Sequence, residues 1–214
     1  MRYTKQLITV SLLMGLSLNS CTNDDNGGPS KQAPAVILFS ASPYKLESKA
    51  IHSESTMPTD LPIGIYGWGH KLNETSPLTP RPDLTNQAYT TADGMNYTSD
   101  MDAHFPVAAD TVINFYAYYP YQASLSNTLA SYDLKDQIDI MYATPILNKG
   151  KMDVQTEANG STATVALTFN HQLSAITIVI KKADDIKEPL ILQEIELLNY
   201  PSSCLLYTSP SPRD

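Results

Sequence analysis

The sequence predicts an all-β protein built as a β-sandwich, and three observations support this fold class. No stretch of ten residues places its apolar side chains at helical spacing. Several short runs instead alternate β-branched or aromatic residues with polar ones, which is typical of strands that bury one face. Turn-forming residues separate these runs, as in a sandwich of short strands. The 13 tyrosines and the low charged fraction of 17% suit an extracellular protein of this class.

The length of 214 residues fits one domain with a targeting segment, or one and a half domains. A hydrophobic fraction of 42% is enough to bury a core. The net charge of −8 argues against a nucleic-acid partner, because proteins that bind nucleic acids usually present a basic patch.

The N-terminus has the layout of a lipoprotein signal peptide over residues 1–20. Arg2 and Lys5 precede an apolar run that is too short to span a bilayer. The run ends in Leu18-Asn19-Ser20-Cys21, which resembles a lipoprotein cleavage box, so we expect Cys21 to be lipidated. The alternative is an ordinary signal peptide with an incidental cysteine. Residues 21–34 are polar and rich in turn formers and predict a flexible tether.

The first half of the body predicts two strands and one hairpin. Residues 35–41 form an apolar run typical of a strand buried on both faces, and residues 42–60 read as an exposed loop. Residues 63–68 predict a strand whose glycines allow a bulge or a close backbone approach. After a proline-rich loop, residues 89–97 predict a hairpin that turns at Asp93-Gly94.

The second half is organised around residues 162–182, which predict two strands. The apolar positions are odd-numbered before Gln172 and even-numbered after Ala175, so the chain must turn or bulge between them. The other predicted elements are a strand at 112–119 ended by Pro120, a polar stretch at 124–139 with a short helical turn, a short strand at 139–144, a hairpin arm between the turn signals 148–151 and 159–160, and a last strand at 190–200.

Six of these segments, in their order and spacing, resemble the fimbrillin family of surface lipoproteins from gut and oral Gram-negative anaerobes. They are residues 37–41, 61–66, 86–97, 115–121 (FYAYYPY), 139–143 and 167–173 (LTFNHQL). The resemblance implies two transthyretin-like, immunoglobulin-like antiparallel β-sandwich domains, of which residues 35–203 would be the N-terminal one. It also implies a structural or accessory fimbrial subunit that supports adhesion, with an outer-membrane lipid anchor, other fimbrial subunits as partners, and host or bacterial surface ligands.

Members of this family assemble by strand exchange after a protease cuts the loop behind the first strand. The resemblance therefore makes Val36, Ile37, Leu38 and Phe39 the core of the strand that leaves its groove. An open sheet edge with an apolar groove is a template for a donated strand. The family's cut often follows arginine, but residues 42–60 contain none. Lys49 is the nearest equivalent and Lys45 the second, and an unprocessed anchor or accessory subunit is the alternative.

The last eleven residues, CLLYTSPSPRD at 204–214, depart from the strand pattern. All of them match one reading frame of a widely used transposase sequencing adapter. We therefore expect the natural chain to be interrupted at Ser203, with the C-terminal domain missing. A natural tail rich in proline and serine is the alternative.

Motifs for catalysis, metals or cofactors are absent from the sequence, so we expect no enzyme, no cofactor and no metal site. The four histidines have no metal-ligand spacing, and there is no glycine-rich phosphate loop. His171 shares strand parity with Phe169, which predicts a structural histidine that faces the core. The main alternative function is a surface glycan-binding lipoprotein that uses exposed Trp68 and tyrosines. A buried Trp68 would remove the best anchor for that function.

Overall fold

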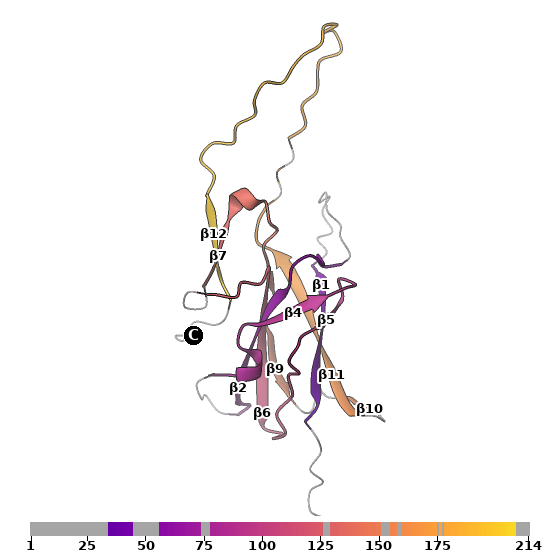
Figure 1. Ribbon diagram of the computed structural model, residues 1–214, viewed down its shortest axis with the longest axis vertical. Coiled ribbons are helices and arrows are strands. Elements are labelled where there is room, and N and C mark those ends of the chain that lie inside the picture. The colour runs from indigo at the N-terminus through magenta and orange to yellow at the C-terminus, as the bar shows by residue number, and fades with distance from the viewer. Residues whose placement is uncertain are drawn as a thin grey trace, which may run out of the picture. The chain divides into compact units, whose positions relative to one another are not determined.

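The computed structural model describes residues 34–44, 56–73, 78–125, 129–150, 155–157, 160–174, 176 and 178–208. The chain divides into two compact units, Met1–Lys31 and Gln32–Asp214, and the described residues belong to the second. They form short strands and two single-turn 3-10 helices (Figure 1). The all-β prediction is confirmed.

The strands lie mostly where alternation predicted them. Their bounds are β1 Val36–Pro43, β2 Ile63–Lys71, β3 Thr79–Pro80, β4 Gln87–Thr91, β5 Asn96–Thr98, β6 Thr111–Tyr119, β7 Leu129–Asp133, β8 Met141–Ala143, β9 Ile146–Gly150, β10 Gln155–Glu157, β11 Gly160–His171 and β12 Ser203–Tyr207. The 3-10 helices are η1 Pro82–Leu84 and η2 Leu134–Asp136.

Seven strands pair in a closed ring that surrounds the main core. Following the ring, β2 pairs with β4, β4 with β5, β5 with β1, β1 with β11, β11 with β8, β8 with β6, and β6 again with β2. The long strand β6 pairs with β8 through its last residues and with β9 through its first ones, so two sheet layers diverge along it. The enclosed core consists of aliphatic and aromatic side chains, among them Phe39, Ile65, Phe115 and Phe169, all nearly inaccessible to solvent.

The N-terminal strand β1 departs from the sequence-based prediction in two ways. It runs parallel to β11 from Val36 opposite Thr162 to Pro43 opposite Phe169, so the sandwich is not wholly antiparallel. It also buries one face and not both: its side chains alternate, and Leu38 is 45% exposed. The reason is that β1 is part of the outer wall, with the core on one side and solvent on the other.

A second apolar cluster covers the outer face of β2 and β6. Its fully buried members include Tyr66 and Tyr118, with Tyr132 of β7 packed against them. A separate two-stranded sheet of β7 and β12 lies over this face. The polar stretch at 124–139 thus contains a strand, β7, that the sequence did not predict, together with the predicted helical turn, η2.

The β4–β5 hairpin confirms the predicted turn at Asp93-Gly94. Gly94 has φ +70°, a conformation that side chains bearing a Cβ rarely adopt. The carboxylate of Asp93 accepts hydrogen bonds from the backbone N–H groups of Met95 and Asn96, at 2.8 and 2.7 Å. These bonds hold the pKa of Asp93 well below its ordinary value. The turn places β5 in register with β1, with Tyr97 opposite Phe39.

The two strands predicted at 176–180 and 190–200 are wrong for this structure. Beyond β11, the described residues up to Ser202 run as coil and turns before the chain pairs again as β12 (Figure 1). Their apolar side chains are exposed, among them Ile178 at 55%, Ile191 at 86% and Leu198 at 66%. An alternating apolar run needs a neighbouring strand and an apolar layer to be stable. Among the described residues, neither run has such a strand.

Two buried tyrosines, one with a hydrogen-bonded hydroxyl and one without, give a matched test of how the strands pack. The Tyr97 hydroxyl has no hydrogen-bond partner among the described residues, whereas the Tyr118 hydroxyl donates to Asn86 Oδ1 at 2.6 Å. We expect Tyr118→Phe to lower the free energy of unfolding by about 1–3 kcal/mol, because it leaves buried polar atoms unpaired. Tyr97→Phe should be neutral or stabilising. Urea denaturation measures both, and equal losses would contradict the described packing.

Candidate functional site

The candidate functional site is the groove that holds β1. On one side β1 pairs with β11 along its whole length. On the other side it makes separate backbone hydrogen bonds: Ile37 N–H donates to the Ala103 carbonyl, Phe105 N–H to the Ala35 carbonyl, and Ala41 N–H to the Met95 carbonyl, each at 2.8 Å. The β1 backbone is therefore bonded on both edges, as a strand inserted between two others.

The floor of the groove is apolar and receives alternate side chains of β1. Ile37, Phe39 and Ala41 point into the core and are each at most 5% exposed. The Phe39 ring makes edge-to-face contacts with Tyr89 and Phe115, with ring centroids 5.0 and 5.5 Å apart. Aromatic pairs in this arrangement add to the stabilisation that comes from buried area. Phe39 is thus the central anchor of β1.

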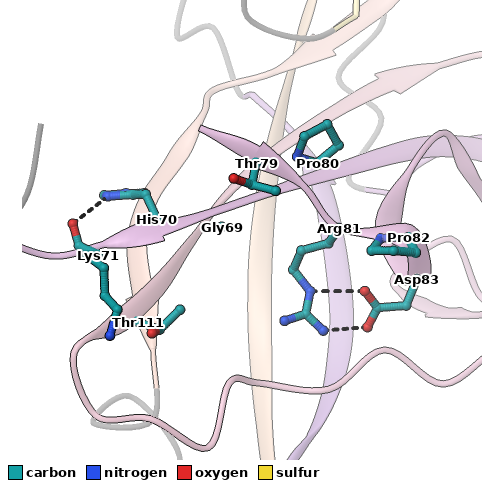
Figure 2. A pocket seen from close by; sticks show the side chains of 9 residues that line it. All are labelled: Gly69, His70, Lys71, Thr79, Pro80, Arg81, Pro82, Asp83 and Thr111. Atoms are coloured by element: carbon teal, nitrogen blue, oxygen red, sulfur yellow. Dashed lines mark hydrogen bonds and ion pairs between the residues drawn. The ribbon is translucent and has the colours of Figure 1, made fainter. Parts of the chain in front are cut away.

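A surface pocket of about 600 Å³ lies beside the end of β2 (Figure 2). Gly69, His70 and Lys71 of β2 line it together with residues 79–83 and Thr111, the first residue of β6. Lys71 Nζ forms an ion pair of 2.5 Å with Asp110. Figure 2 places Lys71 and Thr111 on one side of the pocket, and Arg81 with Asp83 on the other.

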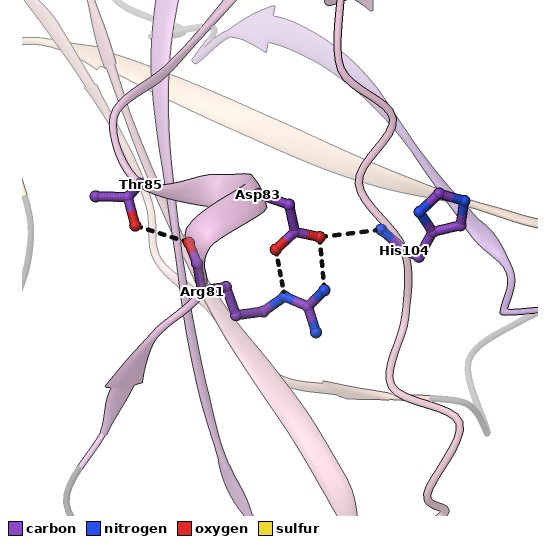
Figure 3. A network of polar contacts seen from close by, with 4 residues as sticks. All are labelled: Arg81, Asp83, Thr85 and His104. Atoms are coloured by element: carbon purple, nitrogen blue, oxygen red, sulfur yellow. Dashed lines mark hydrogen bonds and ion pairs between the residues drawn. The ribbon is translucent and has the colours of Figure 1, made fainter.

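A polar network connects this pocket to the segment at 103–105, which borders β1 (Figure 3). Asp83 accepts two hydrogen bonds from Arg81, from Nε at 3.0 Å and from Nη2 at 2.6 Å, and one from the backbone N–H of His104 at 3.4 Å. His104 in turn forms a β-bridge with Val36. Burial alone would raise the pKa of Asp83, but the hydrogen bonds and charge of Arg81 outweigh it and hold this pKa below its ordinary value.

The Asp83 network gives a prediction with a defined pH dependence. A carboxyl whose pKa is lower in the folded state stabilises the fold above its ordinary pKa near 4, and this contribution is lost as the pH falls through the folded-state pKa. We expect Asp83→Asn to lower the free energy of unfolding by about 1–2 kcal/mol at pH 7 and by much less in acid. Urea denaturation at several pH values measures this. Asp110→Asn, at a fully exposed ion pair, should have a smaller effect, and equal effects would contradict the network's role.

The structure places the sequence-predicted residues as follows. Val36, Ile37, Leu38 and Phe39 lie together in β1. Cys21, Lys45 and Lys49 fall outside the described residues. Trp68 is half-buried against the second apolar cluster, with its indole Nε1 shielded from solvent, so it is less exposed than the glycan-binding alternative expects but not fully buried. His171 is exposed at the end of β11 and pairs with Asp139 at 2.7 Å, so the prediction that it faces the core is wrong.

Sequence reasoning did not identify the pocket or the Asp83 network. The lining residues come from β2, η1 and the start of β6, and no spacing along the chain indicates that they meet. Among the described residues, no group of three His, Cys, Asp or Glu side chains could hold a metal ion. Within those same ranges, no helix has the length and hydropathy needed to cross a membrane.

A family model and two solved structures relate the chain to known proteins. Residues 49–205 match a family model described as fimbrillin-like. Among solved structures, the chain is similar to a protein from Bacteroides uniformis ATCC 8492 described as a candidate cell adhesion protein, with 25% identity, a TM-score of 0.42, and coverage of 64% of this chain and 47% of that one. It is also similar to a fimbrial protein from Bacteroides ovatus ATCC 8483, with 13% identity, a TM-score of 0.36, and coverage of 65% and 29%. No curated protein matches.

The chain thus spans about half the length of the first of these structures and less than a third of the second. The family match covers most of the chain, from residue 49 to residue 205.

Proposed function

The chain belongs to the fimbrillin-like family, and from this premise we propose that it is a structural or accessory subunit of a bacterial surface fimbria. In this proposal Cys21 carries the lipid anchor to the outer membrane, and subunits join by exchange of the strand in the β1 groove. Other fimbrial subunits are the partners, and the assembled fimbria supports adhesion to host or bacterial surfaces. No enzymatic step is part of the function.

The observation that carries the proposal is the way β1 is held. It is the first described strand, and it inserts its alternate side chains into an apolar groove between β11 and the β5 edge. Backbone pairing and alternate apolar anchors are general features of any strand with the same pattern. A strand from a neighbouring subunit can therefore supply the same contacts once β1 has left.

Release of β1 requires a break in the chain behind it. The candidate positions, Lys49 and Lys45, lie between the end of β1 at Pro43 and the first residue of β2, Ile63. A cut there separates β1 from the rest of the fold without removing any other strand of the part that the structure describes. Without a cut, β1 stays in its groove and no strand from a neighbouring subunit can replace it. Such a subunit suits an anchor or accessory position.

We also propose that this chain is the N-terminal part of a longer protein whose natural sequence continues beyond Ser203. Two features support this. Residues 204–214 match adapter-encoded sequence, and the described apolar side chains of the two alternating runs at 176–180 and 190–200 are exposed. Further strands of a second domain would cover these runs. In this account β12, which consists mainly of tail residues, occupies a position beside β7 that another segment fills in the whole protein.

Assembly after cleavage tests the proposed function. The experiment uses the protein encoded by the resequenced source locus, treated with limiting trypsin and followed by size-exclusion chromatography and electron microscopy. We expect high-molecular-weight filaments that form faster at higher protein concentration. The double variant Lys45→Met/Lys49→Met should remain monomeric under the same treatment. A cleaved protein that stays monomeric at all concentrations would overturn the proposal.

A further inference from the structure

The pocket at the end of β2 is an open hollow on the surface of the sheet. Its volume of about 600 Å³ lies within the range typical of small-ligand sites, roughly 300–1,000 Å³. It is framed by three separate elements: the last residues of β2, the β3–η1 segment, and the start of β6. Because β2 and β6 pair directly at this end, with Lys71 opposite Thr111, two sides of the pocket are part of the main sheet.

The polar groups of the pocket have more unused donors than unused acceptors. Both carboxylate oxygens of Asp83 already accept hydrogen bonds from Arg81. Arg81 uses Nε and Nη2 for these bonds, which leaves Nη1 without a hydrogen-bond partner among the described residues. Lys71 Nζ has three N–H bonds, and its one bonded carboxylate, Asp110, also accepts from the Thr111 hydroxyl. Each cation is already ion-paired with a carboxylate, so the lining favours a ligand, such as a further carboxylate, that accepts hydrogen bonds from the remaining N–H groups.

Apart from His70, whose ring is hydrogen-bonded to the Lys71 carbonyl and to Asn114, the remaining lining is small or apolar. Pro80 and Pro82 are among the lining residues, and Gly69 lies on the β2 side. A Cβ built on Gly69 would make only ordinary contacts, at 3.8 Å from Arg81 Cγ and 3.9 Å from the Thr79 and Val112 carbonyls. A small side chain would therefore fit at Gly69, so the glycine is not a packing requirement of the sheet. A compact ring with one apolar face fits such a lining.

From these observations we infer that the pocket binds the carboxylate of an acidic sugar residue, of the uronic acid class. Lys71 and the free Arg81 nitrogen donate to the carboxylate, Thr79 and Thr111 are placed to bond the ring hydroxyls, and the proline rings contact the apolar face of the sugar. The inference rests on the proposed function, since it gives an adhesion subunit a class of surface ligand. It differs from glycan binding at Trp68, because Trp68 is not one of the residues that line this pocket.

Binding of glucuronate to the purified full chain tests the inference, with glucose and acetate as matched probes. NMR titration at low salt should show saturable shifts at Gly69, Lys71 and Thr111. Glucuronate should bind at least about tenfold more tightly than either glucose or acetate, because each of these lacks half of the contacts. Raising the salt concentration should weaken glucuronate binding, because the carboxylate contact is partly exposed.

Two variants locate the binding in this pocket. Lys71→Met should weaken glucuronate binding by about tenfold or more, since it removes a charged donor. Gly69→Val adds a branched side chain at the pocket wall, beside Arg81 and the Thr79 and Val112 carbonyls, and should abolish binding while the chain stays folded. Lys135→Met, at an exposed lysine of η2, is the matched control and should bind as the unmodified chain does.

Three results would overturn the inference: equal binding of glucuronate, glucose and acetate; no saturable binding of glucuronate; or unchanged binding in both pocket variants. The proposed function fails separately, through the absence of filaments after cleavage. A monomer that binds glucuronate but never assembles would keep the pocket inference and reject the fimbrial one. Filaments formed by a protein that does not bind glucuronate would keep the fimbrial proposal and reject the pocket inference.

Discussion

Replacing Phe39 with alanine is expected to lower the free energy of unfolding by about 3–5 kcal/mol, the range for a large aromatic truncated in a core. Phe39 is 2% exposed and touches the rings of Tyr89 and Phe115 across the groove. The alanine variant loses these contacts and leaves a cavity in the middle of the core. Chemical denaturation followed by tyrosine fluorescence measures the loss.

The matched control lies on the same strand. Leu38 is the neighbouring residue, but its side chain points to solvent and is 45% exposed. Leu38→Ala should therefore change the free energy of unfolding by no more than about 0.5 kcal/mol. Comparable losses at the two positions would mean that β1 does not lie in the groove with the observed register.

The second large effect is expected at Gly64, where the sheet has no room for a side chain. Gly64 lies directly opposite Tyr118 in the β2–β6 pairing, and a Cβ at this position would be 2.2 Å from Tyr118 Cε1. The ring cannot move away easily, because its hydroxyl donates to Asn86 and accepts from the Gln122 N–H. Gly64→Ala should lower the free energy of unfolding by about 1–3 kcal/mol or more.

Gly69→Ala is the control for this substitution, because it adds the same methyl group to the same strand at ordinary contact distances of 3.8–3.9 Å from its neighbours. Alanine replaces the more flexible glycine there, so the variant should be as stable as the unmodified chain or slightly more stable. Thermal unfolding of the two variants separates the effects. A stable Gly64→Ala variant would show that the Tyr118 ring does not cover Gly64.

The strands that the sequence predicted correctly are those whose partners lie within the described chain. Residues 112–119 became β6 because their aromatic side chains fill both apolar clusters, with Phe115 on one face and Tyr118 on the other. The turn at Asp93-Gly94 was predictable from the sequence because its own residues stabilise it, through the Asp93 carboxylate and the positive φ of Gly94. Local chemistry and alternation are properties of the sequence itself.

The predictions that failed depended on contacts distant along the chain. The residues at 176–180 and 190–200 alternate as strands do, yet those that the structure describes are exposed coil and turn, because alternation does not supply a partner strand. The strand β7 was missed because polar residues flank its few apolar ones, and its burial depends on Tyr66 and Tyr118 of other strands. The parallel pairing of β1 with β11 likewise follows from the fold and not from any local signal.

The candidate site was predictable in part. Resemblance to a family indicated β1 as the exchangeable strand, and the structure shows how its alternate residues fill the groove. The Asp83 network and the neighbouring pocket were not predictable. Asp83 and His104 are 21 positions apart, and only the folded chain brings the His104 N–H to the Asp83 carboxylate.

The central claim is that β1 occupies a groove that can accept a replacement strand. The most direct test is whether the cut chain binds a free β1 peptide. A specific protease site is placed between residues 45 and 55, the chain is cut, and a labelled peptide of residues 34–44 is added in excess. We expect the peptide to replace β1 slowly and to be retained through size-exclusion chromatography. A peptide with Phe39→Asp should not be retained, because it places a charge in the core. If the cut chain unfolds, or takes up both peptides or neither, the claim of strand exchange at this groove is contradicted.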